Sequence, residues 1–212
     1  MDIEDEKRLA AEAAAKLVEQ GMSVGLGTGT TIAYFLSALA ARSLEIRCVA
    51  TSASTEHAAR ELGLQIDPFD ELGRLDLAVD GADQIAPDGW LVKGGGGAHA
   101  REKIVAAAAD RFVVVASSDK QVESLSPPVP LELMAFGLRA TVRLLGEVEL
   151  RTAPRTPDDG VVADYLGLIE DPCALAAELD ANPGVVAHGL FPSALISEIL
   201  VAKGDGLERI TP

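Results

Sequence analysis

The sequence predicts an α/β fold, a Rossmann-like, mostly parallel sheet with flanking helices, plus a small inserted α+β domain of ferredoxin-like type. Three observations predict it. Short apolar segments alternate with helical segments over the first 120 residues, which is typical of a parallel sheet with right-handed crossovers. Glycine- or threonine-rich loops follow several of these apolar segments. Near Ser126 the pattern changes, and a second helix–strand alternation begins.

The first part of the chain opens with a helix expected over residues 5–20. Leu9, Ala13 and Leu17 recur there at helical spacing, and Gly21 is expected to end it. Short apolar runs bounded by turn residues predict the strands. These are expected at 22–26, 45–50, 64–66, 75–79 and 112–116, with further helices at 30–41, from the 51–55 turn through 61, and at 98–109.

A proline-rich joint precedes the second part. Pro127, Pro128 and Pro130 predict a stiff extended segment that cannot belong to a central strand. After it, helices are expected at 131–145 and 171–181, and strands at 147–151, 161–166 and 184–188. The tail, 194–203 with 207–210, is expected to return to the first sheet. The predicted domains are therefore 1–126 with 190–212 for the catalytic α/β domain, and 127–189 for the small domain.

Composition excludes some classes of partner. Of 212 residues, 48% are hydrophobic, which suffices for a sizeable core, and the formal net charge is −15. So acidic a surface repels nucleic acid and anionic lipid, so we expect neither as a partner. A phosphorylated small molecule would need a local anion site made of backbone N–H groups, a helix N-terminus and a few lysines.

The two cysteines, Cys48 and Cys173, are no disulfide framework, and Cys48 is interpreted as a small buried hydrophobe. The N-terminal segment is acidic and helical, without the features of a secretory leader. No stretch reaches the roughly 20 apolar residues of a membrane span. We therefore expect a cytoplasmic protein in a reducing compartment.

The segment GLGTGTT, residues 25–31, follows a predicted strand and opens a helix. That context favours anion binding by backbone N–H groups. It lacks the Gly-Lys-Ser/Thr of a Walker A loop and the third glycine of a dinucleotide fingerprint. Thr28, Thr30 and Thr31 are left as candidates to hold one phosphate. A tight turn that serves only the backbone is the alternative.

Asp80 and Asp83 flank Gly81 and Ala82 directly after the predicted strand LDLAV. Catalytic residues of α/β proteins gather at such carboxyl ends of strands. An Asx turn with a helix cap, or a metal site, would also use these residue types. Because no histidine lies beside them in sequence, polar positioning of a substrate is favoured over metal binding.

The block KGGGGAHAREKI, residues 93–104, combines a lysine, four glycines and Glu102. A glycine run is tolerated where the backbone approaches a ligand closely, and Lys93 can stabilise a developing oxyanion. Glu102 is a candidate base, or else a favourable charge at a helix N-terminus. His99 is a rival base. Lys120, after another apolar strand, can contact a phosphate or a hydroxyl.

Together, GLGTGTT, DGAD and KGGGGAHAREKI strongly resemble type A ribose-5-phosphate isomerase. Asp119-Lys120, PVPLEL at 128–133 and PGVVAHGLF at 183–191 extend the resemblance to the end of the chain. This sequence departs from the family's pattern at Gly97, at His99 and in the segment 151–170, which looks shorter than the family's strand–turn–strand.

The resemblance implies interconversion of ribose 5-phosphate and ribulose 5-phosphate through a cis-enediolate, without metal or other cofactor, in a homodimer. It implies that Glu102 shuttles the proton while Asp80, Asp83 and Lys93 handle ring opening and stabilise charge. The binding residues it implies are Lys7, Thr28, Gly29, Thr30, Thr31, Gly81, Ala82, Gly94, Gly95, Gly96 and Lys120.

Two other functions use the same residues. A sugar-phosphate sensor domain would bind the phosphate without a base, but it would normally carry a DNA-binding helix-turn-helix, for which this acidic chain has no room. A hydrolase or transferase with Glu102 as nucleophile would leave Asp80, Asp83 and Lys93 less well explained.

Overall fold

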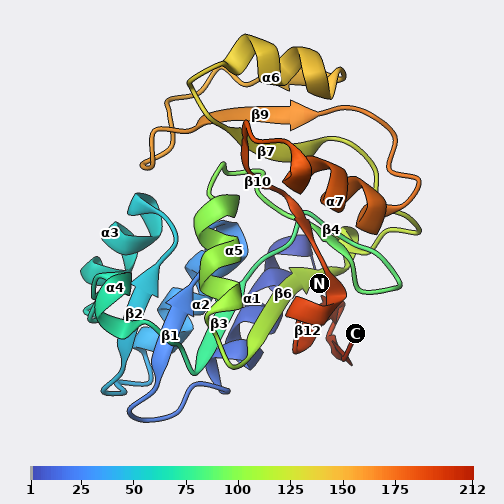
Figure 1. Ribbon diagram of the computed structural model, residues 1–212. Coiled ribbons are helices and arrows are strands. Elements are labelled where there is room, and N and C mark those ends of the chain that lie inside the picture. Colours follow the sequence, from blue (N-terminus) through green and yellow to red (C-terminus); the bar gives the residue numbers. More distant parts are fainter. Residues whose placement is uncertain (1) are drawn as a thin grey trace. The chain divides into compact units, whose positions relative to one another are not determined.

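The computed structural model describes residues 2–212, which divide into two compact units (Figure 1). The first unit comprises the chain up to Ala82, together with Arg101–Lys120 and Ser193–Pro212. The second comprises Asp83–Ala100 and Gln121–Pro192. The predicted domains placed 83–100 and 121–126 in the catalytic domain instead. The predicted division into a catalytic and a small domain stays a prediction, because a compact unit need not be a domain that folds independently.

The first unit is built on a six-stranded sheet in the order β13-β12-β6-β3-β1-β2. Five strands are parallel, and only β13 runs antiparallel, to β12. This confirms the predicted Rossmann-like sheet and the return of the tail. The strands are β1 (Ser23–Leu26), β2 (Arg47–Ala50), β3 (Leu77–Asp80), β6 (Phe112–Ser117), β12 (Glu198–Lys203) and β13 (Gly206–Ile210).

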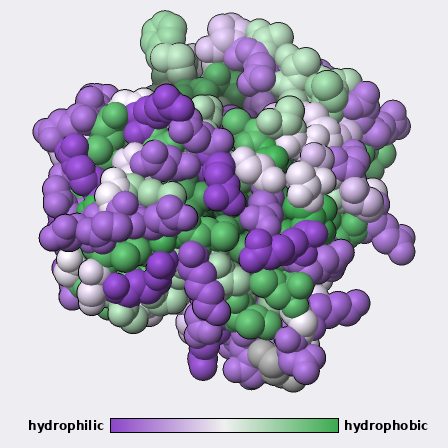
Figure 2. Space-filling view, turned by 90° about the horizontal axis from the view of Figure 1, so that it is seen from below, coloured by the Kyte–Doolittle hydropathy of each residue, from purple (hydrophilic) through white to green (hydrophobic). Residues whose placement is uncertain are grey.

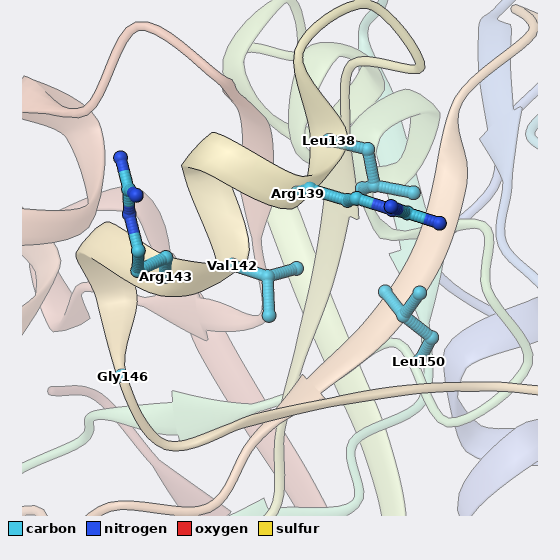
Figure 3. A pocket seen from close by; sticks show the side chains of 6 residues that line it. All are labelled: Leu138, Arg139, Val142, Arg143, Gly146 and Leu150. Atoms are coloured by element: carbon cyan, nitrogen blue, oxygen red, sulfur yellow. The ribbon is translucent and has the colours of Figure 1, made fainter.

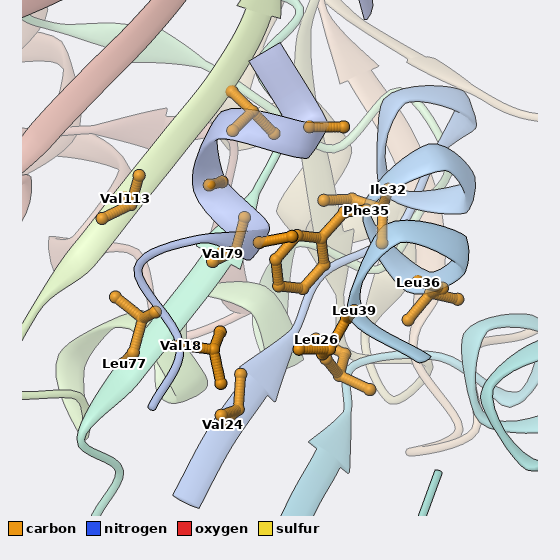
Figure 4. Close-up of a cluster of buried hydrophobic side chains, with 14 of the residues drawn as sticks. Val18, Val24, Leu26, Ile32, Phe35, Leu36, Leu39, Leu77, Val79 and Val113 are labelled. Carbon is orange, nitrogen blue, oxygen red and sulfur yellow. The ribbon is translucent and has the colours of Figure 1, made fainter. Parts of the chain in front are cut away.

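Buried aliphatic side chains join this sheet to two helices, α1 (Ile3–Ala15) and α2 (Thr30–Ala40). Figure 4 shows Phe35 and Ile32 of α2 beside Val79 and Leu26 of the strands. Cys48 lies in the same core, where desolvation raises its pKa to about 12, as expected of a small buried hydrophobe. Shorter helices are α3 (Ala53–Glu61), α4 (Phe69–Leu72), η1 (Ser118–Lys120) and η2 (Ser193–Leu195).

The first helix is shorter than predicted. It ends at Ala15 rather than near residue 20. The guanidinium of Arg42 donates hydrogen bonds to the carbonyl oxygens of Ala15 and Val18, so the last turn is satisfied from outside the helix. The strand predicted at 64–66 is also wrong. Only a single parallel bridge forms there, from Ile66 to Cys48, because Pro68 follows as the N-cap of α4.

The second unit contains a four-stranded antiparallel sheet in the order β10-β7-β9-β8. With its two helices, the chain order is βαββαβ, which confirms the ferredoxin-like arrangement. The elements are β7 (Val129–Leu133), α6 (Leu138–Leu145), β8 (Val148–Leu150), β9 (Val161–Tyr165), α7 (Pro172–Ala181) and β10 (Val185–His188). A second, three-stranded sheet has the order β11-β5-β4, with bounds Leu190–Phe191, Leu91–Val92 and Gln84–Ile85.

Two predictions about the proline joint are wrong. The helix predicted over 131–145 begins only at Leu138, because Val129–Leu133 forms strand β7. That strand contains Pro130 and is central, with β10 on one side and β9 on the other. The strand tolerates Pro130 because pairing with β10 ends at Leu131. Beyond it, Pro130 contributes only its carbonyl oxygen, which accepts a hydrogen bond from Gly189 N at 2.7 Å.

The surface matches the composition. Hydrophilic side chains cover much of the face drawn in Figure 2. None of the helices in residues 2–212 has the length and apolar content needed to cross a membrane.

A buried carboxylate links α1 to two strand ends of the first unit. Glu6 Oε2 accepts hydrogen bonds from Ser118 N at 2.9 Å and Ser118 Oγ at 2.8 Å, and Oε1 accepts one from Gly204 N at 2.7 Å. The backbone N–H donors of Gly204 and Ser118 hold the pKa of Glu6 below its usual range. Glu6 therefore holds the segment after β6, which contains Lys120, against α1.

The Glu6→Gln variant should unfold at a lower temperature than the wild type at pH 7. Because the folded pKa is depressed, the stabilisation is present above the unfolded pKa of about 4.3 and is lost as pH falls through the folded pKa. The difference in thermal midpoint should therefore shrink at pH 3. Calorimetry of both proteins from pH 7 to pH 3 measures it, and a constant difference would contradict this assignment.

Candidate active site

The predicted loops of the first unit lie at one edge of its sheet. β1, β2, β3 and β6 are parallel neighbours, so their carboxyl ends point the same way. The segments that follow them are the glycine turn after β1, the hydroxyl-rich turn after β2, Asp80 at the end of β3, and η1 with Lys120 after β6. This is the edge at which ligands bind in open α/β sheets.

The glycine turn receives the carboxylate of Asp80, which is only 3% exposed. Asp80 Oδ1 accepts hydrogen bonds from Thr28 N at 3.1 Å and Gly81 N at 2.7 Å. A Cβ atom on Gly27 would lie 2.0 Å from Asp80 Oδ1, so any larger residue would displace the carboxylate. Sequence analysis interpreted this motif as an anion-binding loop. In the structure, its glycine at position 27 also leaves the space that the Asp80 carboxylate occupies.

The N-terminus of α2 follows the same turn. Gly29 has φ 128° and ψ 177°, a conformation that is essentially restricted to glycine. Gly29 has no side chain with which to cap the helix, and Gly29 and Thr30 are exposed while Thr31 is half-buried. The first N–H groups of α2 are therefore placed to receive an anion, with two threonine hydroxyls beside them.

A cluster of hydroxyls supports this turn, and sequence analysis treated its segment only as a turn. Thr28 Oγ1 lies 2.8 Å from both Thr51 Oγ1 and Ser52 Oγ. Thr55 Oγ1 donates a hydrogen bond to Gly27 O at 2.9 Å. The signal available in the sequence was four hydroxyl residues within TSAST, directly after a strand. Because Thr28 is bonded within this cluster, its side chain holds the turn in place.

Glu102 lies in the first turn of α5 (His99–Ala107) and is 4% exposed. Further along α5, Val105 packs against Gly25 of β1, where an added Cβ would lie 2.5 Å from Val105 Cγ1. His99, the rival base, is fully buried. A Cβ on Gly94 would lie 2.7 Å from His99 Cβ, so this histidine packs directly against the glycine loop.

A β-hairpin of the second unit has Asp83 and Lys93 at its open end. β4 pairs with β5 in the register Gln84↔Val92 and Ile85↔Leu91, with Asp83 directly before β4 and Lys93 directly after β5. Asp83 N donates to Val92 O, of the residue before Lys93, at 2.8 Å. A carboxylate and a lysine ten residues apart in sequence thus flank the same end of one hairpin.

Lys93 is 3% exposed, and Gly189 and Phe191 contact it within the second unit. Lys93 N donates to Gly189 O at 2.8 Å, and a Cβ on Gly189 would lie 2.2 Å from Lys93 O. The Lys93 ammonium lies 5.4 Å from the centre of the Phe191 ring, a cation–π distance. Gly189 and Phe191 were quoted within PGVVAHGLF but were not assigned to the site.

The glycine run bonds to Asp83 as well. Gly95 N donates to Asp83 Oδ2 at 2.8 Å, and Gly97 N donates to Gly94 O at 2.9 Å, which closes a turn. Gly95 and Gly96 are exposed. The backbone of the loop that follows Lys93 is therefore exposed to solvent at Gly95 and Gly96. The same loop is bonded to the hairpin through Gly95 N and Asp83.

The two predicted phosphate-binding lysines lie on elements that Glu6 joins. Lys7 in α1 pairs with Glu4 at 2.7 Å, and Lys120 in η1 pairs with Asp119 at 3.3 Å. Both partners are neighbours in sequence and in contact with solvent, so these pairs are weak and can be exchanged for an anion. Among residues 2–212, no cluster of three or more His, Cys, Asp or Glu side chains could hold a metal ion.

Comparison with known proteins agrees with these local features. The family model for ribose 5-phosphate isomerase A (phosphoriboisomerase A) matches residues 47–206. Ribose-5-phosphate isomerase A of Caulobacter sp. (strain K31) is 44% identical over 227 aligned positions that cover the whole of both chains.

Two solved structures are also similar. Ribose 5-phosphate isomerase A from Methanocaldococcus jannaschii is 32% identical, with a TM-score of 0.93 over 99% of each chain. A D-ribose-5-phosphate isomerase in complex with phospho-erythronic acid is 31% identical, with a TM-score of 0.94 over 100% of each chain. A match of this extent and coverage shows that this chain belongs to the ribose-5-phosphate isomerase A family.

Proposed function

We propose that this chain interconverts D-ribose 5-phosphate and D-ribulose 5-phosphate, a step of the non-oxidative pentose phosphate pathway. Membership of the isomerase family, with 44% identity over the full length of a relative, is the observation that carries the proposal. The buried Glu102 and Lys93 are the groups that enediolate chemistry needs, a base and a positive charge.

In the proposed reaction Glu102 takes the proton from C2 of the open-chain aldose and returns it to C1 of the ketose. Between these steps the sugar is a cis-enediolate, whose oxygens carry the developing negative charge. Lys93 stabilises that charge. Asp80, Asp83 and Lys93 move protons to and from the sugar hydroxyls as the ring opens. The hydrogen bonds from Thr28 N and Gly81 N fix the orientation of the Asp80 carboxylate for this role.

The phosphate is proposed to bind at the N-terminus of α2 and at the two lysines. Gly29, Thr30 and Thr31 supply N–H groups and hydroxyls, and Lys7 and Lys120 supply charge. A local site of this kind is needed because the net charge of −15 repels a phosphate at long range. Gly81, Ala82 and the backbone of Gly94–Gly96 are proposed to contact the sugar. Binding of the non-reacting phosphate then positions the reacting carbons.

We further propose that the chain binds phospho-erythronic acid, the ligand of the related solved structure. A sugar acid places a carboxylate where the reaction develops an oxyanion, so it should compete with substrate.

We also propose that the protein is a homodimer in the cytoplasm. An apolar surface of the second unit supports the dimer: Phe136 is 90% exposed and Leu144 of α6 is 71% exposed. Beside them, a pocket of about 510 Å³ is lined by Leu138, Arg139, Val142, Arg143, Gly146 and Leu150 (Figure 3). A second copy is the proposed occupant, because large apolar side chains exposed next to one another mark a surface that another protein surface covers. Two free cysteines suit a reducing compartment.

The Glu102→Gln variant should lose isomerase activity by a factor of roughly 10²–10⁴, the usual contribution of a general base. The measurement is ketose formation from ribose 5-phosphate in deuterated water with EDTA, together with deuterium entry into the sugar. Glu12→Gln, an exposed change in α1, is the matched control and should be unaffected. If the wild-type protein binds the sugar phosphate but does not turn it over, the isomerase proposal is wrong and a sugar-phosphate sensor is the better interpretation.

The Gly27→Ala variant should lower kcat/KM by about 10²-fold, because its methyl group would push the Asp80 carboxylate out of place. Gly206→Ala is the control: there an added Cβ would meet nothing closer than 3.4 Å. Steady-state kinetics compare the two. If Gly27→Ala folds and retains full activity, Asp80 has no part in the reaction.

Replacing both Phe136 and Leu144 by Asp should convert the dimer to a monomer, because each would bury a charge in the interface. Sedimentation velocity measures the mass, with Leu62→Asp as a control on an exposed leucine of the first unit. A monomeric wild type, or a variant that remains dimeric, would contradict the proposed interface.

A further inference from the structure

The glycine loop poses a physical problem that its own sequence does not solve. Residues 94–97 are all glycine, the residue that loses most conformational freedom on folding. Gly94 and Gly97 adopt positive φ angles of 100° and 76°. No side chain in this run can hold it, so groups elsewhere must set the conformation of the backbone that follows Lys93.

Arg151, one residue after β8, contacts this loop within the second unit. Its Nη1 donates to Gly95 O at 2.8 Å, with a longer contact of 3.4 Å to Gly94 O. Its other two nitrogens hold Asp164 of β9 as a fork: Nε to Oδ2 at 2.7 Å and Nη2 to Oδ1 at 2.6 Å. The two side chains are only 22% and 18% exposed. The bidentate pair therefore fixes the plane of the guanidinium and aims its remaining nitrogen at the loop.

Gly95 is held from its other side as well. Its N–H donates to Asp83 Oδ2 at 2.8 Å, so both polar groups of this glycine are bonded to charged side chains. The carboxylate of Asp164, and then that of Asp83, raise the pKa of Arg151. Asp83, Gly95, Arg151 and Asp164 thus form one chain of alternating partners.

Packing adds to the hydrogen bonds. A Cβ on Gly97 would lie 3.4 Å from Val162 Cγ2, so the loop rests on β9. Arg151 N donates to Val162 O at 3.0 Å, which seats Arg151 on the same strand. The loop therefore contacts β9 directly at Val162 and is linked to it a second time through Arg151 and Asp164.

We propose that Arg151 is a positioning residue that holds the Gly94–Gly96 backbone, and with it Lys93, in the conformation used in turnover, while Asp164 orients Arg151. The proposal rests on the proposed role of Lys93 and the glycine loop in binding the sugar. It uses the guanidinium fork specifically: a lysine has the charge but cannot hold Asp164 with two bonds and reach Gly95 O with a third.

The test compares Arg151→Met, Arg151→Lys and Asp164→Asn with Arg155→Met. Arg155 is a matched control because it lies in the same segment and its guanidinium bonds to Asp159, away from the glycine loop in sequence. Hydrogen–deuterium exchange of the peptide spanning 93–98 is measured in the substrate-free full-length protein. Steady-state kinetics with ribose 5-phosphate and thermal midpoints are measured on the same samples.

Arg151→Met should speed exchange in residues 93–98 by at least about tenfold and lower kcat/KM by about 10²-fold, the effect of misplacing a bound substrate by roughly 1 Å. Arg151→Lys should remain defective in both measurements, and Asp164→Asn should be intermediate. Arg155→Met should match the wild type. If Arg151→Met folds poorly, the proposal is tested by Arg151→Lys and Asp164→Asn. Each of these variants keeps a polar side chain at the substituted position.

Unchanged exchange in all three variants would overturn the proposal, and so would faster exchange with an unchanged kcat/KM. Failure of the proposed function has a different signature: the wild type itself would not turn over ribose 5-phosphate, whatever the exchange result for Arg151.

Discussion

The carboxylate of Asp80 sets the strongest constraint in the first unit. It is buried at the end of a central parallel strand, and a buried charge is stable only if hydrogen-bond donors replace the lost water. The backbone N–H groups of Thr28 and Gly81 are among these donors. Donation from Thr28 requires β1 and β3 to be adjacent and in register, and it requires a glycine at position 27. The hydroxyl cluster beyond β2 then holds Thr28 itself.

The second unit applies the same principle to a loop. A glycine run cannot position itself, so its conformation depends on charged side chains from distant parts of the chain. Asp83 binds the N–H of Gly95, and Arg151 binds its carbonyl oxygen. Lys93 at the head of the loop is supported in turn by Gly189, whose lack of a side chain allows close approach, and by the ring of Phe191. The freedom that suits glycine to ligand contact is thus limited by partners on neighbouring strands.

Charge is arranged on two scales. The protein carries a net charge of −15, which opposes the approach of any anion. Close to the parallel-sheet edge, however, the N-terminus of α2 and two weakly paired lysines provide a positive environment. Glu6 is acidic, but it does not pair with Lys120. Its carboxylate accepts hydrogen bonds from Ser118, two residues before Lys120, and so positions that segment. The proposed phosphate site therefore depends on local donors at a strand end and not on the net charge of the protein.

The sequence by itself determined the α/β class, the short buried strands of a mostly parallel sheet, the ferredoxin-like second unit and the family. These follow from local periodicity and from motifs of adjacent residues, which a single chain displays directly. It did not determine that Pro130 lies in a central strand, because that depends on where the neighbouring strand β10 stops. Nor did it predict that α1 ends at Ala15, since the capping guanidinium comes from Arg42, in the turn that follows α2. Arg151, Gly189 and the Thr51–Thr55 hydroxyls were missed for the same reason. Their roles are contacts across strands, and only the tertiary structure decides which residues meet.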